Sequence, residues 1–411
     1  MGTNTELAKN LNRRNLMFVM GLCLMLCGSL VFSWSVYVNP LLEAHGWSLT
    51  SVALVGTSAS AFYSAGCFVG GWLRNKIGTK KVLVIGTIGF MAGLFLSGLA
   101  TSPQLLYVTY SGIAGLSAGF IYCVVTFAIG QWFPDRKGLM MACVLAVWGG
   151  SSAFVGPLVT ALIGTVGVIN VFYIEAVVFG AICLVCSFLF KEAPEDFNPF
   201  PEKAAVTVSD QRNYYLPQAV RTWPFWAHLI AMAIYPAFYQ CMSSLFVTFG
   251  LDNGFSQGMA TAILSIVSIC SIIGRIGFGQ LVDKTGWKLG YAAHWIIMTA
   301  GGIGLILFRG IPALLIVSFV LIGIGFGAVA STNAVIAMEE WGPKASGSVF
   351  GAAMLGYVPA SLIVPNIALN LMESSGSYIP LQVFGLICTA VGAVCALSIK
   401  PIKPGRFKEE E

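Results

Sequence analysis

Long runs of apolar residues, each broken by a few charged or turn-forming residues, follow one another along the chain. A helix that crosses a bilayer needs ~20 mostly apolar residues, and these runs have that length. The runs are continuous and do not alternate, so they do not predict the ~10-residue strands of a membrane β-barrel. The pattern predicts twelve transmembrane helices, at about residues 16–39, 50–73, 82–100, 104–129, 138–163, 168–190, 223–249, 257–282, 289–308, 311–338, 346–371 and 376–399.

A polar segment at residues 191–222, rich in Pro and in charges of both signs, divides the runs into two sets of six. The expected fold is therefore an all-α membrane protein with an N-terminal six-helix bundle at 1–190, a cytoplasmic linker loop at 191–222, and a C-terminal six-helix bundle with a short cytoplasmic tail at 223–411. The composition agrees, since 57% of the residues are hydrophobic and only 9% are charged. An ordinary soluble protein is ~25% charged, which excludes an ordinary soluble enzyme.

Basic residues predict the orientation of the chain in the membrane. Of the 22 Lys and Arg residues, all except Arg275 and Arg309 fall at the termini or in loops on one side. Loops rich in Lys and Arg stay on the cytoplasmic side, so we expect a multi-pass protein of the plasma (inner) membrane with both termini in the cytoplasm. The first apolar run is long enough to span the membrane, so we expect it to be retained as a transmembrane helix rather than cleaved as a signal peptide. This distribution explains the net charge of +5 without nucleic-acid binding.

The two sets of helices share a sequence motif. The segment that follows the second run, residues 71–80, and the segment that follows the eighth, residues 279–288, both read Gly-x3-(Asn/Asp)-Lys-x-Gly-x-Lys. Matching turns at the same place in each set indicate two halves in parallel repeat. In transporters built this way, the substrate binds between the halves near the middle of the membrane.

This turn resembles the signature loop of the major facilitator superfamily. Three further stretches, FSWSVYVNPL from Phe32, QWFPDRKGL from Gln131 and AVRTWPFW from Ala219, resemble the monocarboxylate transporter family, and most closely its bacterial oxalate:formate antiporter branch. The resemblance extends from the first predicted helix to the twelfth. It implies a latch or gate at the cytoplasmic side that stabilises one of two alternating states, formed by Asn75, Lys76, Asp135, Arg136, Asp283 and Lys284.

Arg275 is the clearest candidate for substrate binding. It lies inside the eighth run, eight residues before Asp283, and so about 12 Å from that helix end at 1.5 Å per residue. A cation at this depth usually faces a cavity or a counter-charge, and the planar guanidinium matches a carboxylate. The family resemblance implies that this arginine binds the substrate carboxylate. A structural ion pair is the alternative.

Three positions depart from the family pattern. Leu355 lies nearest the place where the oxalate carriers have a second cation, a lysine, so we expect a monocarboxylate rather than a dianion. Ser271 and Leu41 occupy the places where the animal carriers have an aspartate and a lysine that relay a proton. Ser271 and Leu355 are therefore expected to lie in the substrate site, while the proton-carrying group is not identified.

Aromatic residues are expected to line the rest of the site. The resemblance places Tyr122, Phe326 and Phe32 at positions where the family has cavity-facing tyrosines, and Tyr37 and Tyr357 are further candidates. For each of them, packing against lipid or a neighbouring helix is the alternative.

Glu175 is the one carboxylate clearly inside a predicted span, near the outer end of the sixth. Two interpretations stay open for it: a protonatable site, or a position at the outer headgroup boundary or in a local hydrogen bond.

The sequence thus predicts a secondary active transporter of small monocarboxylates, similar to lactate, pyruvate or acetate, that works by alternating access in symport with a proton. Carboxylate exchange and a transporter-derived sensor are the alternatives, and a channel is disfavoured because no filter-like loop is present. We expect no enzyme activity, cofactor, metal or nucleic-acid partner, because no catalytic, metal-ligand or phosphate-binding motif occurs. The expected partners are the monocarboxylate anion, a proton and the lipid bilayer, and the expected functional unit is a monomer.

Overall fold

The computed structural model describes residues 2–194, 197–200, 213–243 and 245–402, and side chains from residue 10 onward except 152–154. Parts of the predicted linker and tail, with the basic residues Lys203, Arg212, Lys403, Arg406 and Lys408, lie outside this range. The first half consists of α1 (Gly2–Gly28), η1 (Ser29–Ser33), α2 (Ser35–His45), α3 (Leu49–Ile77), α4 (Thr79–Gly98), α5 (Pro103–Leu106), η2 (Tyr107–Gly115), α6 (Leu116–Trp132), η3 (Pro134–Arg136), α7 (Lys137–Val166), α8 (Val168–Ile174), η4 (Glu175–Phe179) and α9 (Gly180–Leu189).

The second half repeats this succession of helices after the linker. It consists of α10 (Leu216–Ala219), α11 (Trp223–Ile234), α12 (Ala237–Ser243), α13 (Phe246–Asp252), α14 (Gln257–Thr285), α15 (Trp287–Leu307), α16 (Pro312–Trp341), α17 (Ser346–Met354), α18 (Tyr357–Ser375) and α19 (Tyr378–Leu397).

The all-α fold predicted from the apolar runs is confirmed. Within the described residues, 11 helices are long and apolar enough to cross a membrane, and the count reaches 12 if a bent pair is one span. That pair, Trp223–Ser243 and Phe246–Asp252, bends by 49° and corresponds to the predicted seventh span. The same span is also interrupted between α11 and α12, where Pro236 has no N–H to donate to the helix.

The motif glycines show the repeat at the level of the backbone. Gly78, between α3 and α4, has φ 85° and ψ 161°, and Gly286, between α14 and α15, has φ 81° and ψ 159°. This conformation is essentially restricted to glycine. The two turns that share the sequence motif therefore share a backbone geometry that the motif requires.

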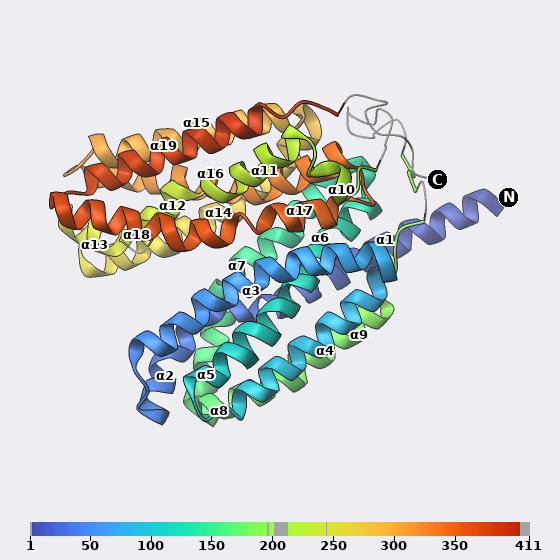
Figure 1. Cartoon of the computed structure of the whole chain (residues 1–411), viewed down its shortest axis with the longest axis horizontal. Coiled ribbons are helices and arrows are strands. Elements are labelled where there is room, and N and C mark those ends of the chain that lie inside the picture. The colour runs from blue at the N-terminus through green and yellow to red at the C-terminus, as the bar shows by residue number, and fades with distance from the viewer. Residues whose placement is uncertain (1, 195–196, 201–212, 244, 403–411) are drawn as a thin grey trace.

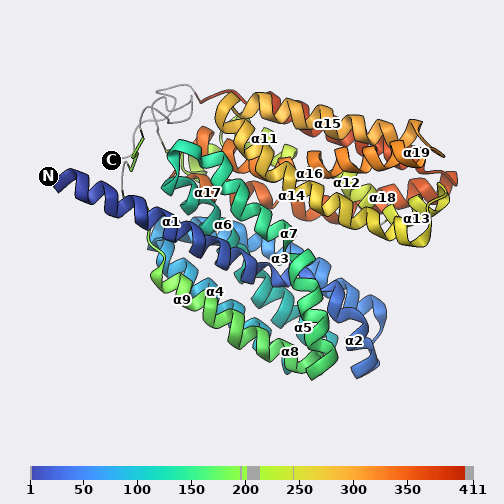
Figure 2. The ribbon, with the colours of Figure 1, turned by 180° about the vertical axis from the view of Figure 1, so that it is seen from behind.

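The two halves lie side by side, in contact at one end and diverging toward the other (Figures 1 and 2). At the end where α1 begins, α3 packs on α17, and α7 packs on α14. We call this the closed end, and define it by Asn75, Lys137, Asp283 and Ser348. The outer surfaces of both halves carry exposed large apolar side chains, such as Val108, Ile296 and Val394, as expected for a protein surrounded by lipid.

Small residues allow the close approach of the halves. A side chain on Gly71 of α3 would overlap the backbone at Gly347 of α17, and one on Gly279 of α14 would overlap Gly138 at the start of α7. Helices that meet through such residues can bring their backbones together in a membrane. The closed end is therefore held by backbone-to-backbone packing as well as by the polar contacts described below.

Candidate functional site

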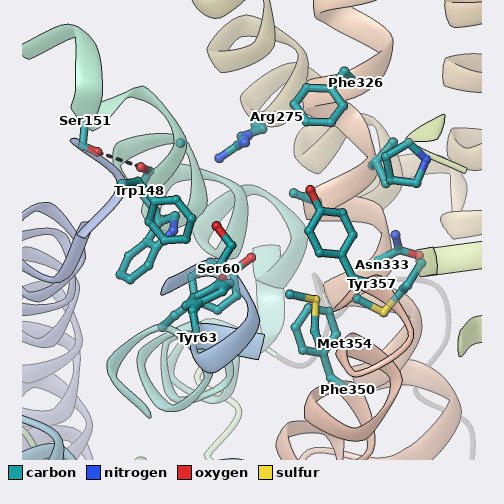
Figure 3. Close-up of a pocket in the computed structure, with 17 residues that line it drawn as sticks. Ser60, Tyr63, Trp148, Ser151, Arg275, Phe326, Asn333, Phe350, Met354 and Tyr357 are labelled. Atoms are coloured by element: carbon teal, nitrogen blue, oxygen red, sulfur yellow. Dashed lines mark hydrogen bonds between the residues drawn. The ribbon is translucent and has the colours of Figure 1, made fainter. Parts of the chain in front are cut away.

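A cavity of about 310 Å³ lies between the two halves (Figure 3). Its volume is at the small end of the range of ligand pockets, ~300–1,000 Å³. The first half contributes one wall through η1, α3, α6 and α7, and the second half contributes the other through α11, α14, α16, α17 and α18. The lining residues are Phe32, Ser60, Tyr63, Tyr122, Trp148, Gly149, Ser151, Met232, Pro236, Arg275, Phe326, Val329, Ala330, Asn333, Phe350, Met354 and Tyr357.

Arg275 brings a positive charge into this cavity from α14 (Figure 3). Its Nη1 donates a hydrogen bond to the carbonyl oxygen of Leu145 in α7, across the interface between the halves. Its Nε is buried and has no hydrogen-bond partner. Among the described residues, no carboxylate forms a salt bridge with Arg275. The guanidinium is thus a partly satisfied donor without a counter-charge, which leaves it able to bind an anion.

Gly149 makes room for this guanidinium. A Cβ atom at position 149 would overlap Nη1, Nη2 and Cζ of Arg275. Because Gly149 belongs to α7 and Arg275 to α14, the arginine reaches across the interface and lies against the backbone of the opposite half. The sequence analysis did not identify Gly149. The dipeptide Gly149-Gly150 directly after Trp148 inside an apolar run is the signal that was available.

Aromatic rings form most of the first-half wall. The ring of Tyr63 packs against Tyr122, Phe32 and Trp148, with centroid distances of 5.3, 5.1 and 5.5 Å. On the second-half wall, Phe326 stacks on Tyr239 at 3.7 Å and 8°. Offset and edge-on ring contacts of this kind fix side chains in place. The cavity therefore offers an apolar, aromatic surface with one charged group.

The structure brings five of the eight predicted substrate-site residues to the cavity: Arg275, Tyr122, Phe326, Phe32 and Tyr357. The other three lie elsewhere. The backbone of Ser271 packs against Gly327 of α16, at the contact between α14 and α16. Leu355 is exposed, next to Met354, which does line the cavity. Tyr37 is buried within the first half, where its hydroxyl group donates a hydrogen bond to Glu175.

Several lining residues were missed by the sequence analysis, among them Tyr63, Trp148 and Asn333. Asn333 is buried, and its Oδ1 has no hydrogen-bond partner in the structure. A carboxamide within an apolar run is a sequence signal for a cavity-lining residue, as the charge of Arg275 is, but a weaker one because the group is neutral. Tyr63 and Trp148 carry no such signal, because an aromatic residue in a membrane helix serves equally for packing.

A set of polar contacts joins the halves at the closed end. The two carboxylate oxygens of Asp283 accept hydrogen bonds from the backbone N–H groups of Gly138 and Leu139, at 2.7 and 2.8 Å. These N–H groups belong to the first turn of α7, where a helix N-terminus favours an anion. Beside them, the ammonium of Lys137 forms an ion pair with Glu339 at 3.0 Å.

Asn75, which matches Asp283 in the repeat, makes the corresponding contact in the first half. Its Nδ2 donates to the hydroxyl group of Ser348, in the first turn of α17, at 3.2 Å. Both motif residues therefore contact the start of a helix in the opposite half. One contact uses a carboxylate and two backbone donors, and the other uses a neutral amide and one hydroxyl group.

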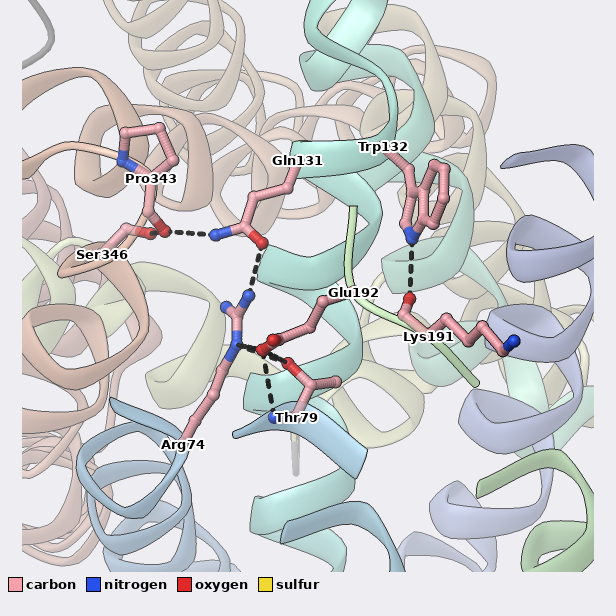
Figure 4. Close-up of polar contacts among 8 residues, drawn as sticks. All are labelled: Arg74, Thr79, Gln131, Trp132, Lys191, Glu192, Pro343 and Ser346. Carbon is pink, nitrogen blue, oxygen red and sulfur yellow. Dashed lines mark hydrogen bonds and ion pairs between the residues drawn. The ribbon is translucent and has the colours of Figure 1, made fainter. Parts of the chain in front are cut away.

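Arg74, next to Asn75, organises a buried network at the same end (Figure 4). Its Nε donates to Thr79 Oγ1 at 2.9 Å, and its Nη2 donates to the Gln131 carboxamide, whose Nε2 donates to the Pro343 carbonyl at 2.7 Å. Glu192 accepts from the backbone N–H of Thr79 at 3.0 Å. The network links the motif turn to the linker side of the first half and, through Gln131, to the second half.

For the other predicted gate residues, the ion pairs and ring contacts found among the described residues do not join the two halves. Asp135 pairs with Arg14 at 2.9 Å and with Arg136 at 3.3 Å, all within the first half. Lys76 lies over the ring of Trp72 at 3.9 Å, and Lys284 is exposed. Thus Asp283 and Asn75 lie at the interface, whereas the lysine that follows each of them does not.

Comparison with known proteins agrees with this architecture. The family model described as Major Facilitator Superfamily matches residues 16–365. The chain is 26% identical over 351 residues to the oxalate:formate antiporter of Oxalobacter formigenes, covering 79% of each chain. It is 25% identical over 344 residues to human monocarboxylate transporter 12, covering 75% of this chain and 65% of that protein.

Solved structures give the same fold at lower sequence identity. The crystal structure of the E. coli fucose:proton symporter superposes with a TM-score of 0.71 at 15% identity, covering 94% of this chain and all of that one. A structure of the same symporter described as being in the outward conformation gives a TM-score of 0.68 at 15% identity, covering 93% and 99% of the two chains.

Proposed function

The chain belongs to the major facilitator superfamily, and from this premise we propose that it carries small monocarboxylates across the membrane by alternating access. The relatives that it resembles include an oxalate:formate antiporter and monocarboxylate transporters. The fold and the relatives support transport rather than catalysis. The lining of the cavity determines which cargo fits.

The observation that carries the proposal is the unpaired charge of Arg275 in a cavity between the halves. A charge removed from water is costly unless an opposite charge compensates for it. A carboxylate that accepts hydrogen bonds from the guanidinium would supply that charge, and charge-assisted hydrogen bonds of this type are among the strong ones. Binding between two halves that move against each other is the arrangement that alternating access requires.

The rest of the lining restricts the cargo to a single carboxylate with a small apolar body. Among the described lining residues, Arg275 is the one charged side chain, so a second carboxylate would enter without a partner. The surrounding rings of Tyr63, Tyr122, Trp148 and Phe326 suit a short hydrocarbon body. Acids of two to four carbons, such as lactate, pyruvate or acetate, fit both conditions.

The contacts between the halves suggest which way this state faces. In the described part of the chain, the hydrogen bonds that join the halves lie at the closed end and at Arg275. The closed end also carries the basic loops, including Arg136 and Lys344. With these loops in the cytoplasm, the protein is a plasma membrane transporter with cytoplasmic termini, and this state faces outward.

We propose symport with a proton as the coupling mode, because an anion and a proton that move together transfer no net charge. Exchange of one carboxylate for another is the second candidate. The missing counter-charge of Arg275 favours exchange, because an empty carrier would pass through its closed state with this arginine unpaired, and a buried unpaired charge is costly.

Counterflow in proteoliposomes tests the proposal. Vesicles loaded with unlabelled lactate should transiently accumulate labelled lactate, and unlabelled pyruvate outside should compete. A channel would equilibrate the label without this overshoot. A sensor would bind lactate, seen as a rise in melting temperature, without any counterflow.

A further inference from the structure

Glu175 is a carboxylate buried inside the first half, away from the cavity that contains Arg275. It is 1% exposed, and it begins η4, about 10 Å along the sixth span from Val168 at 1.5 Å per residue. The hydroxyl group of Tyr37 donates a hydrogen bond to its Oε1, while its Oε2 is buried without a partner. The structure thus places Glu175 within the helix bundle, in a local hydrogen bond with Tyr37.

Aromatic rings surround this carboxyl group. Tyr37 stacks on Phe172 at 4.9 Å and 14°, and Tyr110 lies 6.3 Å from Tyr37 and 4.4 Å from Trp34, measured between ring centroids. Among the described residues, no cation pairs with Glu175. A lone carboxylate in such surroundings is costly in its ionised form, and one hydrogen bond offsets only part of that cost.

The titratable groups around Glu175 are few. Tyr37 comes from α2, and Tyr110 comes from η2, where its hydroxyl group donates to the carbonyl of Val31 at 3.1 Å. Of the helices packed on η4, α8 carries Tyr173, which faces Phe95. The helix α9 carries Cys183 and Cys186, about 12 and 16 Å along the helix from Glu175 at 1.5 Å per residue. The lysines of α4 lie at its opposite end, about 20 Å away at 1.5 Å per residue.

The backbone around this group is irregular in three places. Glu175 begins the π-helical segment η4, and Tyr110 lies in the π-helical segment η2. Tyr37 follows the 3-10 segment η1, which interrupts the first span. Short π-helical segments within α-helices occur frequently at functional sites. Here one such segment, η4, begins with Glu175, and the other, η2, carries Tyr110, whose ring lies 6.3 Å from that of Tyr37.

The 3-10 segment η1 and the start of α2 connect the surroundings of Glu175 to the cavity. Phe32 in η1 packs against Trp148 at 5.8 Å, and Trp148 precedes Gly149, which lies against Arg275. Tyr37 follows Phe32 by little more than one helical turn. A change at Glu175 that moves Tyr37 would therefore move the part of the first span that lines the cavity.

We propose that Glu175, held by Tyr37, is the proton-binding site of the transport cycle, an inference that rests on the proton-coupled transport proposed above. A proton binds to the free oxygen Oε2, and Tyr37 continues to donate to Oε1. With a proton on Glu175 and a carboxylate on Arg275, both lone charges are compensated, so the loaded carrier can close. After closure, release of the proton restores the charge on Glu175 and favours reopening.

The test compares two kinds of transport by the full chain in proteoliposomes. Counterflow of labelled lactate at equal pH on both sides needs substrate binding and alternating access, but no net proton movement. Accumulation of labelled lactate into empty vesicles under an imposed pH gradient needs the proton site. The substitution Glu175→Gln keeps the shape of the side chain and cannot bind a proton.

We expect Glu175→Gln to retain counterflow and to lose accumulation, down to the level that wild type shows with a protonophore. Tyr37→Phe should retain accumulation with a shifted pH dependence, and it decides the question if Glu175→Gln does not fold. The matched control is Glu340→Gln, which replaces another buried carboxylate bonded to an aromatic side chain, Trp287, at 3.2 Å. This control should retain both kinds of transport.

Two results would overturn the inference, and they are distinguishable. If wild type accumulates lactate and Glu175→Gln does so equally, the proton binds elsewhere and proton-coupled transport still stands. If wild type itself accumulates nothing without an internal anion, proton coupling fails, and the role of Glu175 fails with it.

Discussion

The guanidinium of Arg275 lies against the backbone of Gly149, in the space that any side chain at position 149 would fill. The two residues come from α14 and α7, in opposite halves of the molecule. The position of the charge in the cavity therefore depends on the absence of a side chain in the other half. In the alternating-access cycle proposed above, this contact between the halves would differ from one state to the other.

We expect Gly149→Ala to displace Arg275 and to weaken transport. Forcing an extra methyl group into a packed site costs about 1–3 kcal/mol, so uptake at low lactate concentration should fall by about 5- to 100-fold. Gly164→Ala is the matched control, because Gly164 lies in the same helix with open space around it. Uptake by both variants in proteoliposomes gives the comparison, and equal uptake by Gly149→Ala and wild type would contradict the assignment.

Arg275 stands out in the sequence, whereas the only signal for Gly149 is a weak one, the Gly-Gly pair in an apolar run. A charge in an apolar run stands out because the bilayer makes it costly. The role of a glycine depends on the residue that fills the space beside it, and here that residue comes from the other half of the chain. Tyr37 was a further candidate for the cavity lining, but the 3-10 segment η1 breaks the first span before it, and its hydroxyl group donates to Glu175 instead.

The fold was more predictable than the site, because the thickness of the bilayer fixes the length of each apolar run. The repeat was visible because both motif turns need a glycine with positive φ, at Gly78 and Gly286. The bend of 49° within the seventh span and the π-helical segments were not visible. Each depends on packing between helices, which hydropathy does not report.

Arg275→Lys should fold and insert but lose most transport. An ammonium group keeps the charge and loses the planar fork that matches a carboxylate. A hydrogen bond to a charged group is worth about 1.5–3 kcal/mol, so uptake at low substrate concentration should fall by about 10- to 100-fold. Arg309→Lys is the control, since Arg309 lies outside the cavity and donates to Gln382 at 3.1 Å. Wild-type uptake by Arg275→Lys would make Arg275 a structural residue.

The purified protein should bind short monocarboxylates better than dicarboxylates, because the cavity offers one cation among its described lining residues. A ligand that binds only the folded state raises the melting temperature, and at equal concentration the tighter ligand gives the larger shift. A panel of acids at equal concentration should give larger shifts for lactate and pyruvate than for oxalate and succinate. A larger shift with oxalate would refute the one-cation argument and indicate a second positive group in the site.

Asp283→Ala should open the closed end more often. It removes the two hydrogen bonds that backbone N–H groups at the start of α7 donate to the Asp283 carboxylate, each worth about 1.5–3 kcal/mol. The buried thiol of Cys123, which donates to Gly347 of the opposite half, is a native reporter of this opening. Its alkylation by a maleimide, followed by mass spectrometry, should be faster in Asp283→Ala than in wild type.

Asn75→Ala should have a smaller effect, since it loses one neutral hydrogen bond of about 1 kcal/mol. Lys284→Ala, at an exposed position, should leave the alkylation rate unchanged. If Asp283→Ala is alkylated at the same rate as wild type, Asp283 is not a latch.

Lactate should accumulate in empty vesicles when the outside is made acidic. Moving one anion with one proton is electroneutral, so the pH gradient alone drives the process. A gradient of one pH unit corresponds to about 1.4 kcal/mol per proton, which supports accumulation of about tenfold at equilibrium. A protonophore should abolish the accumulation, and a membrane potential imposed with potassium and valinomycin should leave it unchanged. Vesicles pre-loaded with lactate provide the contrasting condition, because exchange requires an internal anion and symport does not. If label enters only the pre-loaded vesicles, whatever the pH gradient, the carrier changes its orientation only when Arg275 holds a carboxylate, and the protein is an exchanger of carboxylates.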